Sequence, residues 1–290
     1  MKQRRPLSPA EMYPSGERDV ATRFIVLETG IRVRVAESGP RDGTPVVMLH
    51  GWGASLYMFR HALALSVAYG MRAIAVDLRG FGLSDKPRRR GAYTLDAYCA
   101  DLDALLDVLA IPHVALLGHS MGGGLALRYA LRRPERLTRV ALINPVGLVP
   151  VIYPKLLRPV PRFLGHLLNE RLVPRSLVAL ILRHLAYGNA SCVTEHDIDE
   201  YWAPTQQPGY VQAAHAALRE FDWRPLTVAE RASLTTPCLV VLGTQDRVVR
   251  AARLRYAPLR NARVQAFNGG HCVHEELHDD VYRLIRDFLR

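Results

Sequence analysis

Continuous apolar runs alternate with helical patterns along this chain, and this alternation constrains the fold more than any other feature. Such runs occur in TPVVMLHGWG, HVALLG, RVALINP and CLVVLG. Apolarity without alternation indicates a strand covered on both faces, as in a parallel sheet between two layers of helices. Helical periodicity lies around residues 58–69, 93–109 and 122–132. The order predicts an α/β fold with a doubly wound, mostly parallel sheet.

The remaining elements follow from local signals. The alternating runs Phe24–Glu28 and Ile31–Glu37, separated by Thr29-Gly30, predict a β-hairpin. Thr94 precedes the second helical pattern and is expected to cap it. RAIAVDLRG predicts a further buried strand, and the C-terminal part predicts a helix near 251–256, a strand in ARVQAFN and a helix over 279–289.

The strand–helix rhythm stops at Pro145 and resumes only after about residue 224. Prolines 150, 154, 159, 161 and 174 fall in this interval, together with apolar and basic stretches such as RSLVALILRHLAYG. We therefore predict a flexible lead-in over 1–20, a core formed by 21–145 and 225–290, and an inserted helical cap over 146–224. Most of the apolar cap residues are expected to pack into the core of the cap: Leu156, Leu157, Phe163, Leu164, Leu167, Leu168, Leu177, Leu180, Ile181 and Leu185.

Composition excludes several classes of protein. The chain has 290 residues, 49% hydrophobic content and a net charge of +11, carried mostly by scattered arginines. No nucleic-acid-binding motif accompanies this charge, so a charged surface is the preferred interpretation. The N-terminus lacks the apolar segment of a signal peptide, which favours a cytoplasmic protein. The basic apolar run from Lys155 to Arg183 leaves contact with a membrane surface as a less favoured alternative. Cys99, Cys192, Cys238 and Cys272 show no metal-type spacing and are expected to be reduced.

The stretch Gly118-His119-Ser120-Met121-Gly122 follows an apolar run and opens a helical pattern. It matches G-x-S-x-G, in which a serine occupies a sharp turn between a strand and a helix. Glycines at both ends provide clearance, because side chains there would meet the adjoining strand or helix. This placement predicts that Ser120 is a nucleophile.

A serine nucleophile needs a base and an acid that orients the base. Asp246 follows the CLVVLG strand and His271 follows the ARVQAFN strand, so both are expected at the edge where the strands end. The acids Asp77, Asp197 and Asp222 are weaker candidates. His274 and His278 are expected to be surface residues.

Acyl transfer also needs donors for the developing oxyanion. The backbone N–H of Met121 is expected to supply one. The glycine-rich turn His50-Gly51-Trp52-Gly53 follows an apolar strand and is placed to supply a second from Trp52, although an ordinary turn would share this composition. The His50 side chain is expected to brace the loop.

These motifs resemble those of the α/β-hydrolase family: HGWG over 50–53, DLRGFGLS over 77–84 and GHSMGG over 118–123. The resemblance covers nearly all of the chain outside the N-terminal segment and the cap. It implies a Ser120–Asp246–His271 triad and an oxyanion hole formed by Trp52 and Met121. It further implies structural support from His50, Gly51, Gly118, Gly122, Asp77 and Arg79, with no metal and no cofactor.

Departures from the family patterns narrow the reaction. Epoxide hydrolases and haloalkane dehalogenases of this fold carry an aspartate where this chain has Ser120. Carbon–carbon bond hydrolases of the meta-cleavage type carry asparagine and tryptophan where this chain has His119 and Cys272. The preferred prediction is a serine esterase acting on small-molecule esters, while lactonase, meta-cleavage and cofactor-free haloperoxidase-like activities stay open. A small-molecule receptor on the same scaffold is the non-enzymatic alternative.

Overall fold

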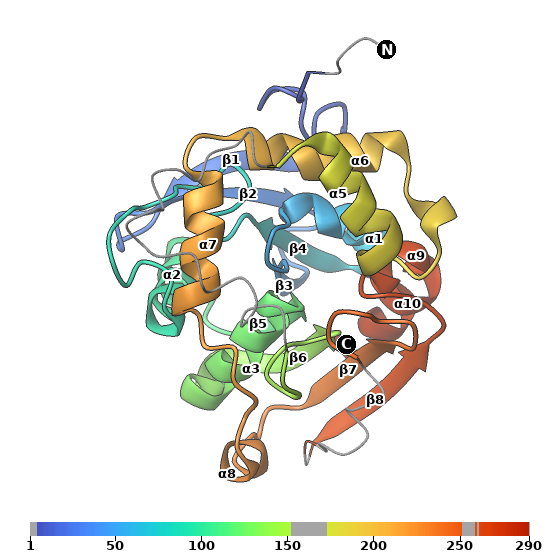
Figure 1. Ribbon diagram of the computed structural model, residues 1–290. Coiled ribbons are helices and arrows are strands. Elements are labelled where there is room, and N and C mark those ends of the chain that lie inside the picture. The colour runs from blue at the N-terminus through green and yellow to red at the C-terminus, as the bar shows by residue number, and fades with distance from the viewer. Residues whose placement is uncertain (1–4, 152–172, 251–258, 260, 290) are drawn as a thin grey trace.

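The fold is described from a computed structural model, in which residues 5–151, 173–250, 259 and 261–289 are described. Strands and helices alternate from the N-terminal hairpin to the C-terminal helix, as the apolar runs predict (Figure 1). The strands are β1 (Ala21–Val26), β2 (Arg32–Ser38), β3 (Thr44–Leu49), β4 (Met71–Val76), β5 (Val114–His119), β6 (Leu137–Ile143), β7 (Cys238–Gly243) and β8 (Ala262–Phe267).

The strands form one sheet in the order β1-β2-β4-β3-β5-β6-β7-β8. The β1–β2 and β2–β4 pairs are antiparallel, and all pairs from β4 to β8 are parallel. The doubly wound, mostly parallel sheet and the hairpin are therefore confirmed. Because β3, β5, β6 and β7 run in the same direction, the loops after them meet at one edge of the sheet.

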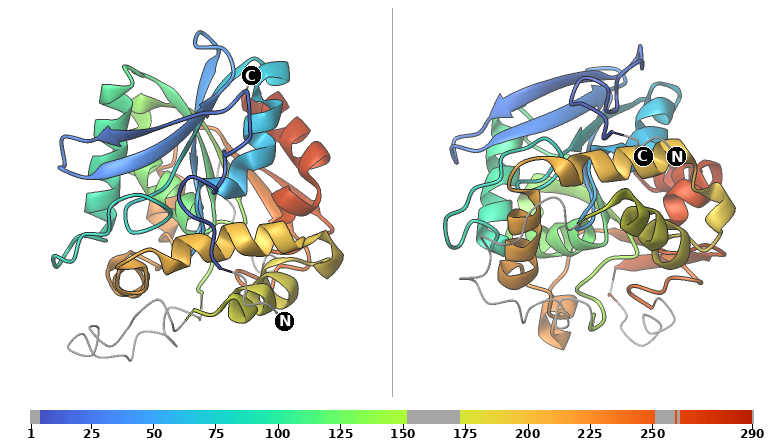
Figure 2. Two further views of the ribbon diagram at one scale, coloured as in Figure 1. Left: turned by 90° about the horizontal axis from the view of Figure 1, so that it is seen from above. Right: turned by 45° about the horizontal axis from the view of Figure 1, so that its top comes forward.

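Helices cover both faces of the sheet (Figure 2). One face carries α1 (Arg60–Tyr69) and α10 (His278–Leu289), which contact each other, and the other carries α2 (Leu95–Val108) and α3 (Met121–Arg132). The buried apolar side chains accordingly form two large clusters. The predicted cap of α2 is confirmed, since Thr94 Oγ1 accepts a hydrogen bond from the N–H of Ala97.

The described part of the interval 146–224 is helical. It contains α5 (Arg175–Ile181), a π-helical turn η5 (Leu182–Ala186), 3₁₀ turns η6 (Ala190–Cys192) and η7 (Ala203–Gln206), α6 (Glu195–Trp202) and α7 (Tyr210–Glu220). These helices lie beyond the ends of the parallel strands (Figures 1 and 2). The other short elements are η1 (Leu56–Phe59), η2 (Pro134–Arg136), α8 (Val228–Ala232) and α9 (Val273–Glu276).

Four of the apolar residues named for the predicted cap lie on the protein surface. Leu177, Leu180, Ile181 and Leu185 are exposed, so the prediction that they pack into a cap core is wrong. The reason is helical geometry, because α5 and η5 bury the opposite stripe of Val178, Leu182 and Ala186. The other apolar residues named for the cap, Leu156, Leu157, Phe163, Leu164, Leu167 and Leu168, lie outside the described residues, as does the helix expected near 251–256.

Membrane-spanning helices and disulfides can be assessed for the described part of the chain. Within it, each helix is too short or too polar to cross a bilayer. All four cysteines are free thiols, with Cys99, Cys238 and Cys272 buried.

Candidate active site

Ser120 occupies a strained turn between β5 and α3. Its backbone has φ +51° and ψ −113°, a conformation that L-residues rarely adopt. The turn is held from β6, because Ser120 N–H donates to Ile143 O at 3.0 Å and Ser120 O accepts from Val146 N at 3.0 Å. A Cβ at Gly122 would lie 2.0 Å from Leu49 O, and one at Gly118 would lie 2.6 Å from Gly122 O. Only glycine allows this close packing of strand and helix.

Asp246 and His271 lie together at the same edge of the sheet. His271 Nδ1 is 2.9 Å from Asp246 Oδ2, and both residues are only 6% exposed. Asp246 Oδ1 accepts from the N–H groups of Val248 at 2.7 Å and Val249 at 3.0 Å. Burial alone would raise the pKa of Asp246, but His271 and the two N–H donors outweigh it and lower the pKa. An ionised Asp246 therefore fixes the Nδ1–H tautomer of His271, which directs Nε2 away from the carboxylate.

His119 connects the nucleophile's strand to the histidine loop. His119 Nε2 lies 2.9 Å from His271 O, and the two rings have centroids 4.5 Å apart. The carbonyl can only accept, so His119 donates from Nε2 and leaves Nδ1 without a proton. Burial and the neighbouring His271 lower the pKa of His119 well below its usual value. No hydrogen bond joins Ser120 to His271 among the described residues, so the remaining contact of a triad is not formed here.

The loop after β3 lies beside Ser120. A Cβ at Gly51 would be 3.2 Å from Ser120 Cβ and 2.8 Å from His119 Nδ1. Helix α7 holds this loop, since Trp52 Nε1 donates to Ala214 O at 2.9 Å and Tyr210 Oη donates to Gly53 O at 3.0 Å. The structure thus places the Trp52 turn and the start of α3 next to the serine.

His50 braces the loop in the neutral form. Its Nε2 accepts from the N–H of Leu78 at 3.0 Å, so its Nδ1 carries the proton and donates to Gly51 O at 2.7 Å. Full burial lowers the pKa of His50. A neutral ring with both nitrogens bonded to backbone is a structural support.

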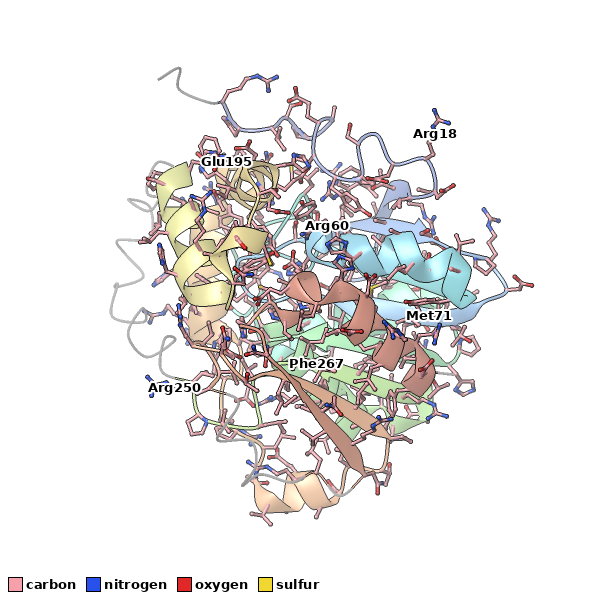
Figure 3. All side chains as sticks on the ribbon, turned by 90° about the vertical axis from the view of Figure 1, so that its right-hand side faces the viewer. Arg18, Arg60, Met71, Glu195, Arg250 and Phe267 are labelled. Carbon is pink, nitrogen blue, oxygen red and sulfur yellow. The ribbon has the colours of Figure 1, made fainter. Side chains whose placement is uncertain are left out.

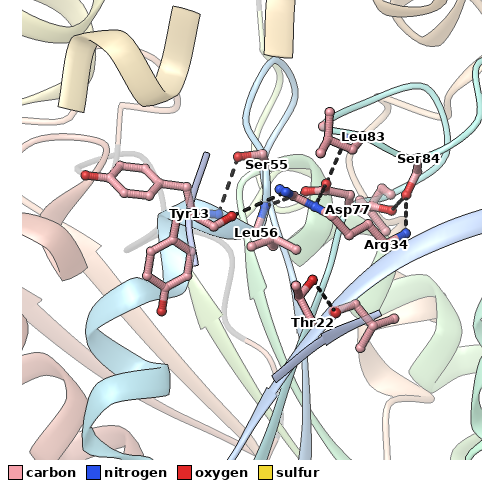
Figure 4. Close-up of polar contacts among 12 residues, drawn as sticks. Tyr13, Thr22, Arg34, Ser55, Leu56, Asp77, Leu83 and Ser84 are labelled. Carbon is pink, nitrogen blue, oxygen red and sulfur yellow. Dashed lines mark hydrogen bonds and ion pairs between the residues drawn. The ribbon is translucent and has the colours of Figure 1, made fainter. Parts of the chain in front are cut away.

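Asp77 and Arg79 support neighbouring backbone from buried positions. Asp77 accepts from the N–H groups of Leu56 at 2.7 Å and Leu83 at 2.8 Å, and pairs with Arg34 at 2.8 Å (Figure 4). Arg79 pairs with Asp101 and donates to Ala92 O. Among the described residues, neither side chain forms a hydrogen bond or an ion pair with Ser120, Asp246 or His271, and the supporting role stays a prediction.

The expectation that His274 is a surface residue is wrong. His274 is 0% exposed, and its ring lies 4.9 Å from that of His119. Helical spacing toward the last helix misled here, because α9 ends at Glu276 and α10 starts at His278, with Leu277 in a non-helical conformation between them. His278 itself is partly exposed. The alternative acids also lie elsewhere, with Asp197 bonded to Tyr57 and Asp222 paired with Arg128.

Two side chains that hold the loops together were not predicted from the sequence. Glu276 accepts from Gly270 N at 2.7 Å and from Asn189 N at 2.9 Å, which joins the histidine loop to the segment between η5 and η6. Asn144, directly after β6, bonds both the histidine loop and the end of β7. The available signal for Asn144 was a polar residue directly after a buried strand, at the edge that holds Ser120. Within the described residues, His, Cys, Asp and Glu form no group of three or more that suits a metal ion.

Comparisons with known proteins identify the family of the fold. Residues 44–276 match the family described as alpha/beta hydrolase fold. An uncharacterized protein of Mycobacterium tuberculosis is 31% identical over 92% of this chain and 81% of its own. A haloalkane dehalogenase of Psychrobacter cryohalolentis is 28% identical over 90% of this chain and 88% of its own. A meta-cleavage product hydrolase from Pseudomonas fluorescens, a solved structure, is 25% identical with a TM-score of 0.76, covering 92% of this chain and 96% of that chain.

Proposed function

Because the chain belongs to the alpha/beta hydrolase fold family, we propose that it is a serine hydrolase that cleaves carboxylic esters of small molecules. The observation that carries this proposal is the 2.9 Å contact between Asp246 and His271, at the edge of the sheet where Ser120 occupies its strained turn. Nucleophile, base and orienting acid are thus assigned to Ser120, His271 and Asp246.

The proposed reaction proceeds by two acyl transfers. His271 Nε2 accepts the proton of Ser120 as Oγ attacks the ester carbonyl, and Asp246 stabilises the imidazolium that results. His271 then gives this proton to the leaving alcohol. In the second half, His271 takes a proton from water, and the resulting hydroxide attacks the acyl group on Ser120. Collapse of the second intermediate breaks the bond between the acyl carbon and Ser120 Oγ, His271 returns its proton to Oγ, and the carboxylic acid is released.

The oxyanion is assigned to two backbone donors. Met121 opens α3, and the first N–H groups of a helix have no partner within it. Trp52 lies in the turn whose Gly51 packs against Ser120. A tetrahedral oxyanion is stabilised when two N–H groups point to it from one side. We assign these two donors to the backbone N–H groups of Met121 and Trp52. The proposed roles require no cofactor or metal, and the partner they imply is a small-molecule ester.

A serine at position 120 favours ester hydrolysis over the dehalogenation and epoxide hydrolysis that some relatives are named for. An aspartate in the elbow would form an alkyl-ester intermediate from a halide or an epoxide, whereas the serine here is suited to acyl transfer. His119 and Cys272 replace the asparagine and tryptophan expected of a meta-cleavage hydrolase. Lactones are cyclic esters and fit the same mechanism, so they belong to the substrates to be compared.

The test is the conversion of Ser120 to alanine. Ser120→Ala is expected to reduce kcat/KM for p-nitrophenyl esters by at least about 10⁴-fold, because the covalent step has no alternative nucleophile. Ser233→Ala, at an exposed serine of α8's C-terminal cap, is the matched control and should keep wild-type turnover. Esters of graded acyl length, lactones and a ring-cleavage diketone would be compared. Wild-type turnover of the diketone alone, or undiminished ester turnover in Ser120→Ala, would contradict the proposal.

A further inference from the structure

Asn144 is a fully buried polar residue that follows β6 directly and adopts φ +41°. Asparagine tolerates this left-handed conformation better than other residues with side chains, because its short amide bonds locally to the backbone. The position therefore requires a particular backbone, and it also holds a side chain with two donors and one acceptor group.

All three polar functions of the Asn144 amide are directed at loops of the candidate site. Nδ2 donates to His271 O at 2.8 Å and to Gly270 O at 3.1 Å. Oδ1 accepts from the N–H of Gly243 at 2.9 Å. Two carbonyls on one side and an N–H on the other fix the orientation of the amide. Asn144 thus joins the loop that carries His271 to the end of the strand that leads to Asp246.

The backbone around Asn144 holds the third loop. Ile143 O accepts from Ser120 N, and Val146 N donates to Ser120 O, both at 3.0 Å. Asn144 N itself donates to Val241 O at 2.9 Å. The segment from Ile143 to Val146 therefore holds the serine turn through its backbone. The Asn144 amide in the same segment holds the His271 loop and the end of β7, which leads to Asp246.

The His271 carbonyl accepts two hydrogen bonds from side chains, one from Asn144 and one from His119. A carbonyl held from two sides cannot rotate freely, so the direction of the attached Cα–Cβ bond is restrained. Small displacements of a catalytic group reduce the rate strongly, by up to about 10²-fold per ångström.

We propose that Asn144 is a positioning residue that sets the direction of the His271 imidazole relative to Ser120 and Asp246. This inference rests on the proposed function of these three residues and extends it to a residue outside the triad. Asn144 acts through the backbone of the His271 loop and does not itself contact the reacting atoms.

Two variants separate the amide from the backbone conformation. Asn144→Asp keeps the size of the side chain and the acceptor for Gly243 N but removes both donors to the carbonyls. Asn144→Gly keeps access to φ +41° and removes the whole side chain, so it remains informative if the aspartate fails to fold. Asn261→Asp is the control, because Asn261 is exposed and its Nδ2 also donates to a backbone carbonyl, that of Thr235 at 3.1 Å.

Two readouts test the proposal on the full chain. Ester kinetics should show kcat lowered about 10- to 100-fold in both Asn144 variants, with KM changed less than about threefold, because the change affects the chemical step. Proton NMR of ¹⁵N-histidine-labelled protein should show the Nδ1–H resonance of His271 shifted or exchange-broadened. A His271→Gln variant assigns this resonance, and Asn261→Asp should leave both readouts unchanged.

The outcomes distinguish this inference from the proposed function. A wild-type protein without ester turnover would contradict the proposed function, whereas the NMR comparison would still decide the role of Asn144. Folded Asn144→Gly protein with an unshifted His271 resonance would overturn the inference, as would wild-type kcat in that variant. A large rise in KM with unchanged kcat would also contradict it, since that pattern indicates a role in binding substrate.

Discussion

At the scale of single residues, the site depends on where a side chain is forbidden as much as on where one is required. Gly122 packs its Cα against the carbonyls of Leu49 and His50, while Gly124, in the same helix, faces a methyl group of Val146. Backbone atoms of a central strand cannot move aside, whereas a valine side chain can rotate or shift. Gly122 and Gly124 therefore differ in what they tolerate, although both are buried.

Gly122→Ala is expected to be far more damaging than Gly124→Ala. Its Cβ would lie 2.0 Å from Leu49 O, so α3 must move away from β3 and carry Ser120 with it. We expect a loss of stability of at least about 3 kcal/mol, comparable to a severe overpacking, together with loss of ester turnover. Gly124→Ala should cost less than about 2 kcal/mol. Urea unfolding of the three proteins measures this, and equal destabilisation by the two substitutions would refute it.

Some of the proposed site residues could be named from the sequence because their signal is local. The G-x-S-x-G spacing reports a local steric requirement, so Ser120, Gly118 and Gly122 could be assigned from neighbouring residues alone. His50 was expected to brace its loop, and its two backbone hydrogen bonds show how. Asn144 offered no comparable spacing, because its partners Gly243 and His271 are 99 and 127 residues away in the chain.

At the scale of elements, α6 carries a buried carboxylate whose partner comes from the N-terminal segment. A capping box formed by Thr194 and Asp197 starts α6. Glu200, on the same helix, is 1% exposed and accepts from the N–H of Tyr13 at 2.8 Å. Burial raises the pKa of Glu200 to about 7, although Tyr13 N–H, Arg34 and Arg60 act in the opposite direction. The charge of Asp197 raises the pKa of Glu200 further. Exposed His196 faces the same carboxylate, with its Nε2 3.8 Å from Glu200 Oε1.

The raised pKa predicts a pH-dependent effect of Glu200→Gln. Between pH 4.5 and about 7 the folded state keeps a proton that the unfolded state releases, so this group's contribution to stability falls as pH rises through that window. Above pH 7 Glu200 is ionised in both states, and its burial costs on the order of 3 kcal/mol. The amide keeps an acceptor for Tyr13 N–H and does not ionise. Glu200→Gln should therefore stabilise the protein strongly at pH 8.5 and by less than about 1 kcal/mol at pH 5.

Denaturant unfolding at these two pH values measures the effect. Glu135→Gln, at an exposed glutamate before β6, provides the control and should change stability little at either pH. The same stabilisation by Glu200→Gln at pH 5 and pH 8.5 would show that Glu200 is not protonated in the folded protein near neutrality.

At the scale of the whole molecule, a buried ionic cluster joins α1 and α9 to α6. Arg60 opens α1 (Figure 3), and it pairs with Asp197 of α6 at 3.0 Å and with Glu275 of α9. Tyr57 Oη donates to Asp197 at 2.6 Å, and Tyr201 Oη donates to Glu275 at 2.6 Å. The Arg60 side chain is 15% exposed and that of Glu275 is 0% exposed. Because α9 follows His271 closely, this cluster joins α6 to the segment that carries the proposed base.

Arg60→Met is expected to destabilise the protein by about 3–5 kcal/mol. Methionine retains the apolar part of the side chain, but two buried carboxylates lose their counter-charge, and unpaired buried charges carry the full cost of desolvation. Arg132→Met is the matched control, because the Arg132–Asp96 pair has side chains 44% and 81% exposed, for which about 0–1 kcal/mol is expected. Thermal and urea unfolding compare the two, and a loss under about 1 kcal/mol for Arg60→Met would contradict the cluster's assigned role.

Much of the fold could be read from the sequence, because the information is local. Continuous apolar runs report strands covered on both faces, and the order of runs and helices leaves few topologies for one parallel sheet. The sheet order and the parallel pairs from β4 to β8 agree with this. That topology, in turn, explains why Asp246 and His271, each placed after a strand, meet within 2.9 Å at one edge.

The tertiary structure alone decided which polar residues are buried and what they bind. His274 looks like a surface residue by helical spacing, yet the break between α9 and α10 buries it beside His119. The partners of Arg60 and Asn144 come from distant segments, so no local pattern could name them. The physical reason is range: periodicity and turn chemistry act over a few residues, whereas burial and hydrogen bonding depend on which segments the complete fold brings together. The sequence by itself determined the sheet and the order of the proposed catalytic residues, and only the folded chain determined the side chains that hold them in place.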